Sequence, residues 1–162
     1  MRKRGFYINP DGHLSVMIPN YDRGPTGSHP EFTDEEFYDF FVARVLETQG
    51  LIGTTTYEMP ETDMPSDRTF REAWECPGGV IKVNMPKARG IHMDRIRVVR
   101  NAELAAKDIT FMRAVEAGDA SAQSTIATQK QTLRDIPQTF DLTTDNAEQL
   151  KAKWPTELPP QG

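Results

Sequence analysis

Residues 86–119 read PKARGIHMDRIRVVRNAELAAKDITFMRAVEAGD, and after the opening proline no further proline interrupts them. Proline is favoured in the first turn of a helix, so the stretch predicts one helix of about 30 residues, about 45 Å long. Gly118 suits the end of that helix, and Asp119 suits the start of another. A second helix is predicted over residues 120–135 and is closed by Pro137. The two helices are expected to form an antiparallel helical hairpin.

A mostly apolar seam follows the first helix at spacings of three and four residues. Such a narrow seam is typical of a helical hairpin or a coiled coil. We expect its apolar members, chiefly Val98, Ile109 and Met112, to pack within the chain or against another subunit. The seam consists of Ile91, Arg95, Val98, Ala102, Ala105, Ile109, Met112 and Glu116, and the second helix offers Ala122, Ile126, Gln129 and Leu133 at matching spacing.

The first part of the chain predicts a β-hairpin. The β-prone runs 5–8 and 13–18 are separated by Asn9-Pro10-Asp11-Gly12, which is typical of a type I turn closed by a glycine bulge. Because an isolated hairpin is only marginally stable, we expect residues 54–59 to add a third strand. Residues 19–32 are rich in proline and glycine and are predicted to form an extended arm.

A helix is predicted over residues 34–48 because its start signals are complete. Thr33 and Glu36 match the capping-box pattern, and Phe32 stands where a hydrophobic staple contacts the first turn. Gly50 is suited to end this helix.

Another short helix is predicted over residues 67–74, capped by Ser66. Phe70 and Trp74 lie one turn apart in it and face the same way, so this face is expected to pack within the chain or against a subunit.

The predicted fold class is α+β, mainly α overall. A small β-hairpin and helix module over residues 1–79 precedes the helical hairpin, which spans 80–137. Residues 138–162 are expected to form a short helix capped by Thr144 or Asp145, followed by a proline-rich tail that frays in a free chain.

Composition excludes several classes of protein. The 162 residues carry a net charge of −5, one cysteine and three histidines. The single Cys76 cannot form an internal disulfide, and the histidines lack metal-ligand spacing. No stretch is long and apolar enough to span a membrane. We therefore expect no metal, no cofactor and no membrane association, and a dedicated nucleic-acid binder would be more basic.

No catalytic motif is present, so we expect a protein that is not an enzyme. A pairing of Cys76 with His92 as nucleophile and base is the only catalytic arrangement to weigh, and we interpret His92 as part of an exposed charged patch instead. Arg95, Arg97 and Arg100 crowd the first half of the long helix. They suit charged docking to a protein, with nucleic acid as the alternative.

Several segments between Met64 and Pro155 carry a family resemblance. They read MPSDRTFREAW (64–74), VNMPKARGIHMDR (83–95), FMRA (111–114), EAGD (116–119), QKQTLRDIP (129–137) and EQLKAKWP (148–155). These segments resemble small proteins encoded beside tail and tail-fibre genes in tailed bacteriophages and prophages. The KQTLRD segment also looks like the C-terminal part of phage tail assembly chaperones and fibre-assembly proteins. Residues 19–50 depart from that pattern.

The resemblance implies a phage tail or tail-fibre accessory protein whose partners are tail or tail-fibre proteins. In the first interpretation it stays in the virion tail as an adaptor or attachment component, in several copies of a symmetric assembly. In the second it is an assembly chaperone of the host cytoplasm that is absent from the mature virion. A small nucleic-acid-binding regulatory protein is a third. The residues predicted to dock partners are Phe70, Trp74, Arg95, Arg97, Val98, Arg100, Ile109, Met112 and Trp154.

Overall fold

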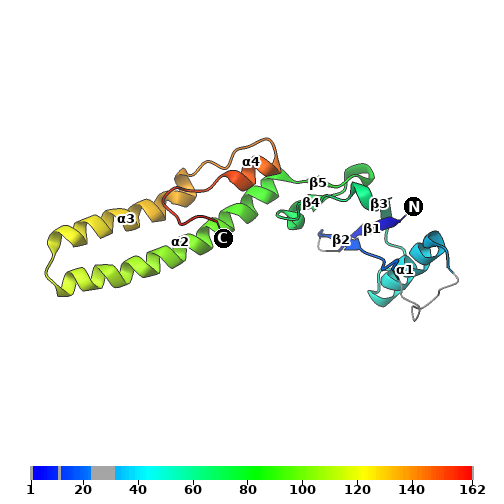
Figure 1. Ribbon diagram of the computed structural model, residues 1–162, viewed down its shortest axis with the longest axis horizontal. Coiled ribbons are helices and arrows are strands. Elements are labelled where there is room, and N and C mark those ends of the chain that lie inside the picture. Colours follow the sequence, from blue (N-terminus) through cyan, green and yellow to red (C-terminus); the bar gives the residue numbers. More distant parts are fainter. Residues whose placement is uncertain (1, 11, 23–31, 162) are drawn as a thin grey trace. The chain divides into compact units, whose positions relative to one another are not determined.

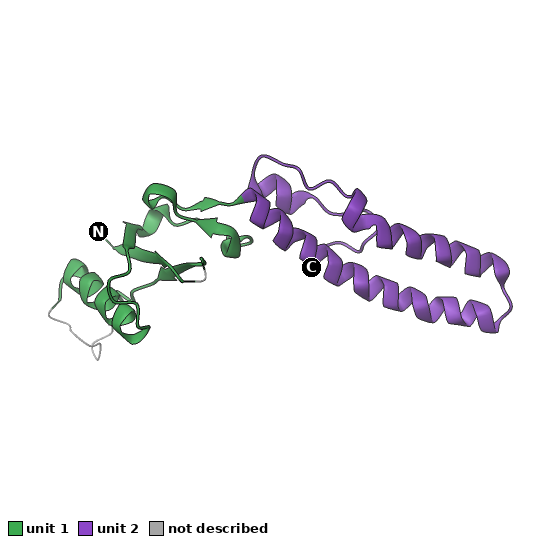
Figure 2. Cartoon of the chain, turned by 180° about the vertical axis from the view of Figure 1, so that it is seen from behind, with its two compact units in different colours: residues 1–84 green, residues 85–162 purple. Residues whose placement is uncertain are grey.

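The computed structural model describes residues 2–10, 12–22 and 32–161. The chain divides into two compact units, unit 1 (Met1–Asn84) and unit 2 (Met85–Gly162), which Figure 2 shows in different colours. The structure thus places residues 80–84 with the N-terminal module and residues 138–161 with the helical hairpin. Most of the predicted arm, residues 23–31, lies outside the described residues.

Unit 1 contains a three-stranded antiparallel sheet in the order β2-β1-β3 (Figure 1). Its strands are β1 (Lys3–Ile8), β2 (Leu14–Met17) and β3 (Thr56–Pro60). The predicted turn between β1 and β2 is confirmed, because the Gly12 amide donates to the Asn9 carbonyl at 2.8 Å and Gly12 has a φ of 82°. A positive φ favours glycine, which explains its place in the turn.

Helix α1 (Asp34–Thr48) has the predicted bounds and the predicted cap. The Glu36 amide donates to Thr33 Oγ1 at 3.3 Å, and the Thr33 amide donates to the Glu36 carboxylate at 2.8 Å. At the other end Gly50, with a φ of 67°, donates to the Glu47 carbonyl, while the Leu51 amide reaches back to Leu46. Those two bonds form a Schellman motif.

Unit 1 has a core built around β1. Phe6 is fully buried and forms a cluster with Met59 and Cys76. Tyr38 of α1 packs over Gly5 of β1 so closely that a Cβ on Gly5 would lie 2.8 Å from the tyrosine hydroxyl oxygen. The sheet is therefore covered by side chains from distant parts of the unit.

The predicted helix over residues 67–74 is wrong. The Thr69 amide donates to Asp67 Oδ1 at 2.8 Å, a local turn that competes with helix formation. Residues 74 and 75 are extended because they form β4 (Trp74–Glu75), which pairs antiparallel with β5 (Lys82–Val83). Between β3 and β5 the helical elements are all short 3-10 turns. They are η1 (Glu61–Asp63), η2 (Arg71–Ala73) and η3 (Pro77–Gly79).

Unit 2 is built on the predicted helical hairpin, with α2 (Met85–Glu116) and α3 (Ala120–Thr139) side by side (Figure 1). Gly118, with a φ of 67°, ends α2, and its amide donates to the Val115 carbonyl. Asp119 caps α3 by accepting the Ala122 amide at 2.9 Å. The predicted helix end at Gly118 and the predicted helix start at Asp119 are therefore both confirmed.

Helix α3 does not end at Pro137, which lies inside its last turn. Proline removes one backbone donor, yet the helix continues because the Phe140 amide still bonds to the Ile136 carbonyl at 2.9 Å. Leu133 and Ile136, just before the proline, are buried. Their packing holds this last turn in place.

Helix α4 (Ala147–Ala152) is the predicted C-terminal helix, but its cap lies one residue later than expected. Asn146, and neither Thr144 nor Asp145, accepts the Gln149 amide, at 2.9 Å. The helix packs on α2.

Candidate protein-docking surfaces

Helix α2 has two different faces. Its inner face is the set of residues that are buried, and it contacts α3 and the residues that follow α3. This face consists of Ala88, His92, Met93, Ile96 and Ala114.

The predicted seam lies on the other face. Val98 is 70% exposed, and Ile109 and Met112 are each 57% exposed, so packing of these side chains within the chain is wrong. The buried residues Ala88, His92 and Ile96 recur every four residues. Val98 follows Ile96 by two residues, which is about 200° around the helix axis, so the seam that contains Val98 faces away from α3. Packing of the seam between subunits stays a prediction.

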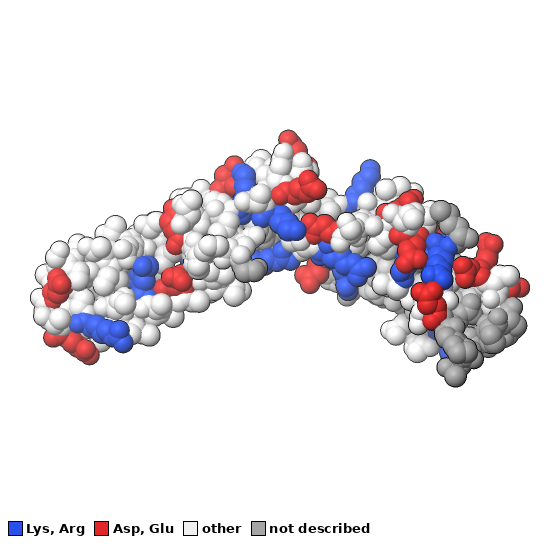
Figure 3. Space-filling view, viewed as in Figure 1, with Lys and Arg blue, Asp and Glu red and all other residues white. Residues whose placement is uncertain are grey.

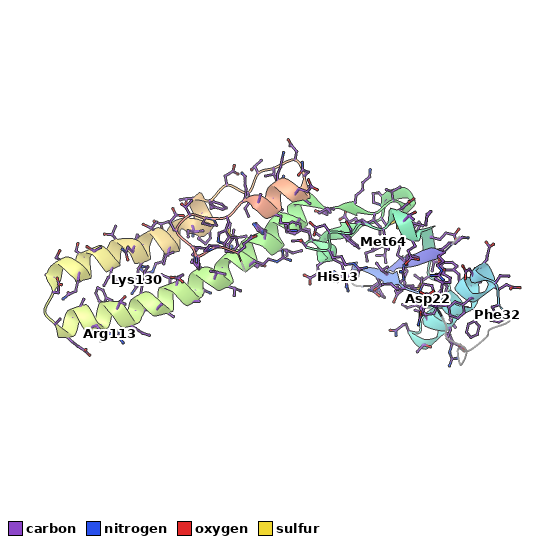
Figure 4. All side chains as sticks on the ribbon, viewed as in Figure 1. His13, Asp22, Phe32, Met64, Arg113 and Lys130 are labelled. Atoms are coloured by element: carbon purple, nitrogen blue, oxygen red, sulfur yellow. The ribbon has the colours of Figure 1, made fainter. Side chains whose placement is uncertain are left out.

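Polar contacts join α2 and α3 about midway along α3. Lys107 Nζ donates to Gln129 Oε1 at 2.8 Å. Lys130, labelled on α3 in Figure 4, forms an ion pair with Asp108, and its ammonium lies 5.3 Å from the centre of the Phe111 ring. At this level of the hairpin the two helices meet through polar side chains. The buried apolar residues of α3, Leu133 and Ile136, lie closer to its C-terminal end.

The C-terminal strap, residues 140–161, is fastened to α2 by His92. The His92 side chain is 1% exposed, and its Nε2 donates to the Lys153 carbonyl at 2.7 Å. The Trp154 ring stands edge-on to the imidazole with ring centres 6.0 Å apart, and its indole N–H donates to the Pro159 carbonyl at 2.7 Å. The prediction of an exposed His92 is therefore wrong, and its spacing of four from Ala88 and Ile96 is the signal that would have placed it inside.

Buried apolar side chains between residues 142 and 158, together with one arginine of α2, attach the strap to the rest of unit 2. Arg89 of α2 adds a hydrogen bond to the Thr144 carbonyl at 2.9 Å. The expectation of a frayed tail is wrong for the described residues, because the tail carries its own core side chains. Those buried in unit 2 are Leu142, Leu150, Pro155 and Leu158.

Asp141 and Lys153 close the strap on itself electrostatically. Lys153 Nζ donates to the Asp141 and Thr143 carbonyls at 2.9 and 3.1 Å and lies 3.4 Å from an Asp141 carboxylate oxygen. Hydrogen bonds from the Thr143 hydroxyl and amide, together with the Lys153 charge, lower the pKa of Asp141 from 3.8 to about 2. The carboxylate is therefore charged throughout the physiological pH range.

Removal of the Asp141 carboxylate by Asp141→Ala is expected to lower the melting temperature of unit 2 at pH 7, and by much less at pH 2. The pKa of this group in the folded chain lies below its ordinary value of 3.8, so its stabilising contribution is present above that value. The contribution is lost as the pH falls through about 2. Thermal unfolding of both proteins across pH 2 to 7 measures this, and a constant difference would contradict it.

Two of the three candidate arginines make local contacts within α2. Arg97 pairs with Asp94 one turn away at 2.7 Å, and Arg100 donates to Asn101 at 3.0 Å. Arg95 is exposed. Figure 3 shows both acidic and basic side chains on the visible side of unit 2.

In unit 1 the two aromatic candidates are interior residues. Phe70 and Trp74 are each 3% exposed. Of the two roles predicted for them, packing within the chain is the one that such burial favours. Trp154 is half-buried in the strap.

Sequence reasoning did not find an apolar groove at the C-terminal end of α1. Its volume is about 550 Å³. Ile52 at its edge is 80% exposed and Phe40 is 40% exposed. The groove is lined by Phe40, Ala43, Arg44, Leu46, Glu47, Ile52 and Gly53.

The described residues form no cluster that could hold a metal ion. Cys76 is buried, and burial raises the pKa of its thiol, so the reactive thiolate is disfavoured at neutral pH. Among the described helices, none is both long and apolar enough to cross a membrane.

Comparison with known proteins relates most of unit 2 to a phage tail assembly family. Residues 93–159 match the family model described as phage tail assembly chaperone protein. None of the curated proteins and none of the solved structures compared with the chain matches it. The resemblance found in the C-terminal region is therefore confirmed, and it connects the chain with phage tail assembly.

Proposed function

We propose that this chain is a phage tail assembly chaperone that binds a tail or tail-fibre protein during assembly and leaves before the virion is complete. The observation that carries the proposal is the family match, because residues 93–159 run from the first third of α2 through α3 and along most of the strap of unit 2. The matched segment lies within one compact unit, and such units can in principle fold by themselves. No catalytic step is part of this role.

The adaptor interpretation loses its main support in the structure of the strap. If neighbouring virion proteins were needed to hold the C-terminal segment in place, that would favour the adaptor. His92, Leu150 and Leu158 instead hold that segment within unit 2. The chaperone role is therefore the better proposal, and a fixed number of symmetric copies in the tail belongs to the adaptor alternative.

Two measurements on one phage separate the alternatives. A tagged chain is expected to co-purify with a tail or tail-fibre protein from infected cells in the assembly period, and mass spectrometry is expected to find no trace of it in purified virions. Stoichiometric amounts in virions would overturn the chaperone role in favour of the adaptor. Recovery with nucleic acid that nuclease treatment abolishes would support the regulatory alternative.

Arg97 and Arg100 are proposed to supply charged contacts to the client protein. A charge-neutral Arg97→Gln/Arg100→Gln variant is then expected to recover less client, and moderate salt should weaken binding of the unaltered chain. Lys151→Gln on α4, an exposed cation outside this pair, is the control. Binding that resists both salt and substitution would remove the two arginines from the client surface.

A further inference from the structure

The outer face of α2 carries a second apolar stripe that the fold of unit 2 leaves uncovered. All its members are exposed, whereas the inner face of the same helix is occupied by α3 and the strap. The outer stripe consists of Arg95, Val98, Ala102, Ala105, Ile109, Met112 and Glu116. Its alternating spacings of three and four residues are those of a coiled-coil seam, which places one line of side chains against a partner helix.

The order of side chains along the stripe is self-complementary. An antiparallel copy of α2, centred between Ala102 and Ala105, places these two alanines opposite each other. The same register places Val98 opposite Ile109 of the second copy, and the aliphatic stem of Arg95 against Met112. Small residues face small ones at the centre and larger apolar residues face each other on both sides, so the layers match by size.

Charge selects the antiparallel orientation. In that orientation Arg95 lies about one helical turn from Glu116 of the second copy, and the pair occurs twice by symmetry. A parallel pair would instead place Arg95 against Arg95 and Glu116 against Glu116, which is repulsive at both ends. From Arg95 to Glu116 the stripe is about 32 Å long, at 1.5 Å per residue.

From these observations we propose that two copies of the chain associate through the outer stripe of α2 as an antiparallel, two-fold symmetric helix pair. Each copy keeps its own hairpin and strap, and the two copies meet only through surfaces that are exposed in one chain. The inference goes beyond the proposed function, because it concerns the purified chain without any client and can fail independently of the chaperone role.

Sedimentation of the purified full-length chain tests the association. The chain is expected to be a dimer, and Ile109→Asp is expected to weaken the dimer by at least about 100-fold, because symmetry buries the new charge twice. Since Ile109 is 57% exposed in one chain, helix content by circular dichroism should not change. Ile52→Asp, at a side chain of unit 1 that is 80% exposed, is the matched control and should remain dimeric. A wild-type monomer from nanomolar to millimolar concentration overturns the proposal.

Disulfide trapping tests the orientation. In a Cys76→Ala background, Val98→Cys mixed with Ile109→Cys is expected to give a cross-linked pair on oxidation, and neither protein should cross-link efficiently alone. Efficient cross-linking of Val98→Cys with itself would show a parallel pair and overturn the antiparallel assignment. Arg95→Glu should weaken the dimer, and Arg95→Glu/Glu116→Arg should restore it. Failure of that restoration would contradict the register.

Discussion

A Leu150→Ala variant is expected to destabilise unit 2 by about 3 kcal/mol. Leu150 is fully buried and is the only buried residue of α4, so its side chain attaches that short helix to the rest of the unit. Truncation removes apolar contact and leaves a cavity that a helix of six residues cannot fill by a small shift. The strap is expected to detach from α2 at lower denaturant concentration than in the unaltered chain.

The fluorescence of Trp154 can be used to measure the free energy of unfolding of this variant. The chain has two tryptophans, Trp74 in unit 1 and Trp154 in the strap, so a Trp74→Phe background leaves a single tryptophan, whose selectively excited fluorescence reports on unit 2. Urea unfolding is followed through that signal with and without Leu150→Ala. Val115→Ala, at a side chain that is 45% exposed on α2, is the control and should change the free energy of unfolding by less than about 0.5 kcal/mol. Equal effects of the two substitutions would contradict the role assigned to Leu150.

A Phe6→Ala variant is expected to destabilise unit 1 by about 4 kcal/mol. Phe6 is fully buried in β1, and its ring stacks on Tyr57 of β3 with ring centres 5.8 Å apart. Its cluster also contains Met59 and Cys76, the latter from the irregular segment after β4. Phe6 therefore packs the sheet against the irregular segment that contains Cys76. Its truncation removes apolar contacts from both parts.

A Trp154→Phe background leaves Trp74 as the reporter for unit 1. Ile8→Ala, at the 39% exposed end of the same strand, is the matched control and should cost much less than Phe6→Ala. The strap signal of Trp154, measured in the Trp74→Phe background, should remain close to that of the unaltered chain. A loss of about 4 kcal/mol in both signals would show that the two units unfold together.

The turns and helix ends were predictable because their chemistry is local. Thr33 and Glu36 satisfy backbone groups within one turn, and Gly118 and Asp119 act on residues no more than five positions away. Such signals depend on neighbours in sequence and not on the rest of the fold. The bounds of α1 and the reversal between α2 and α3 follow from them.

The face of α2 that becomes buried was not predictable in the same way. Both Val98 and Ile96 belong to apolar series at helical spacing, but Ile96 is fully buried and Val98 is 70% exposed. Periodicity shows that a helix has apolar stripes, and it does not say which stripe meets α3 when there are two. Phe70 and Trp74 show the reverse case, since the sequence suggested one helical face and the structure buries both residues without a helix.

By itself, the sequence determined the mainly α fold with a small N-terminal sheet, the bounds of α1, the reversal between α2 and α3, and a resemblance to phage tail assembly proteins. Only the tertiary structure decided that the strap returns to α2 and that His92 is buried beneath Trp154. The physical reason is distance along the chain. Lys153 is 61 residues from His92, and a contact of that separation depends on how elements pack, which local propensity does not encode.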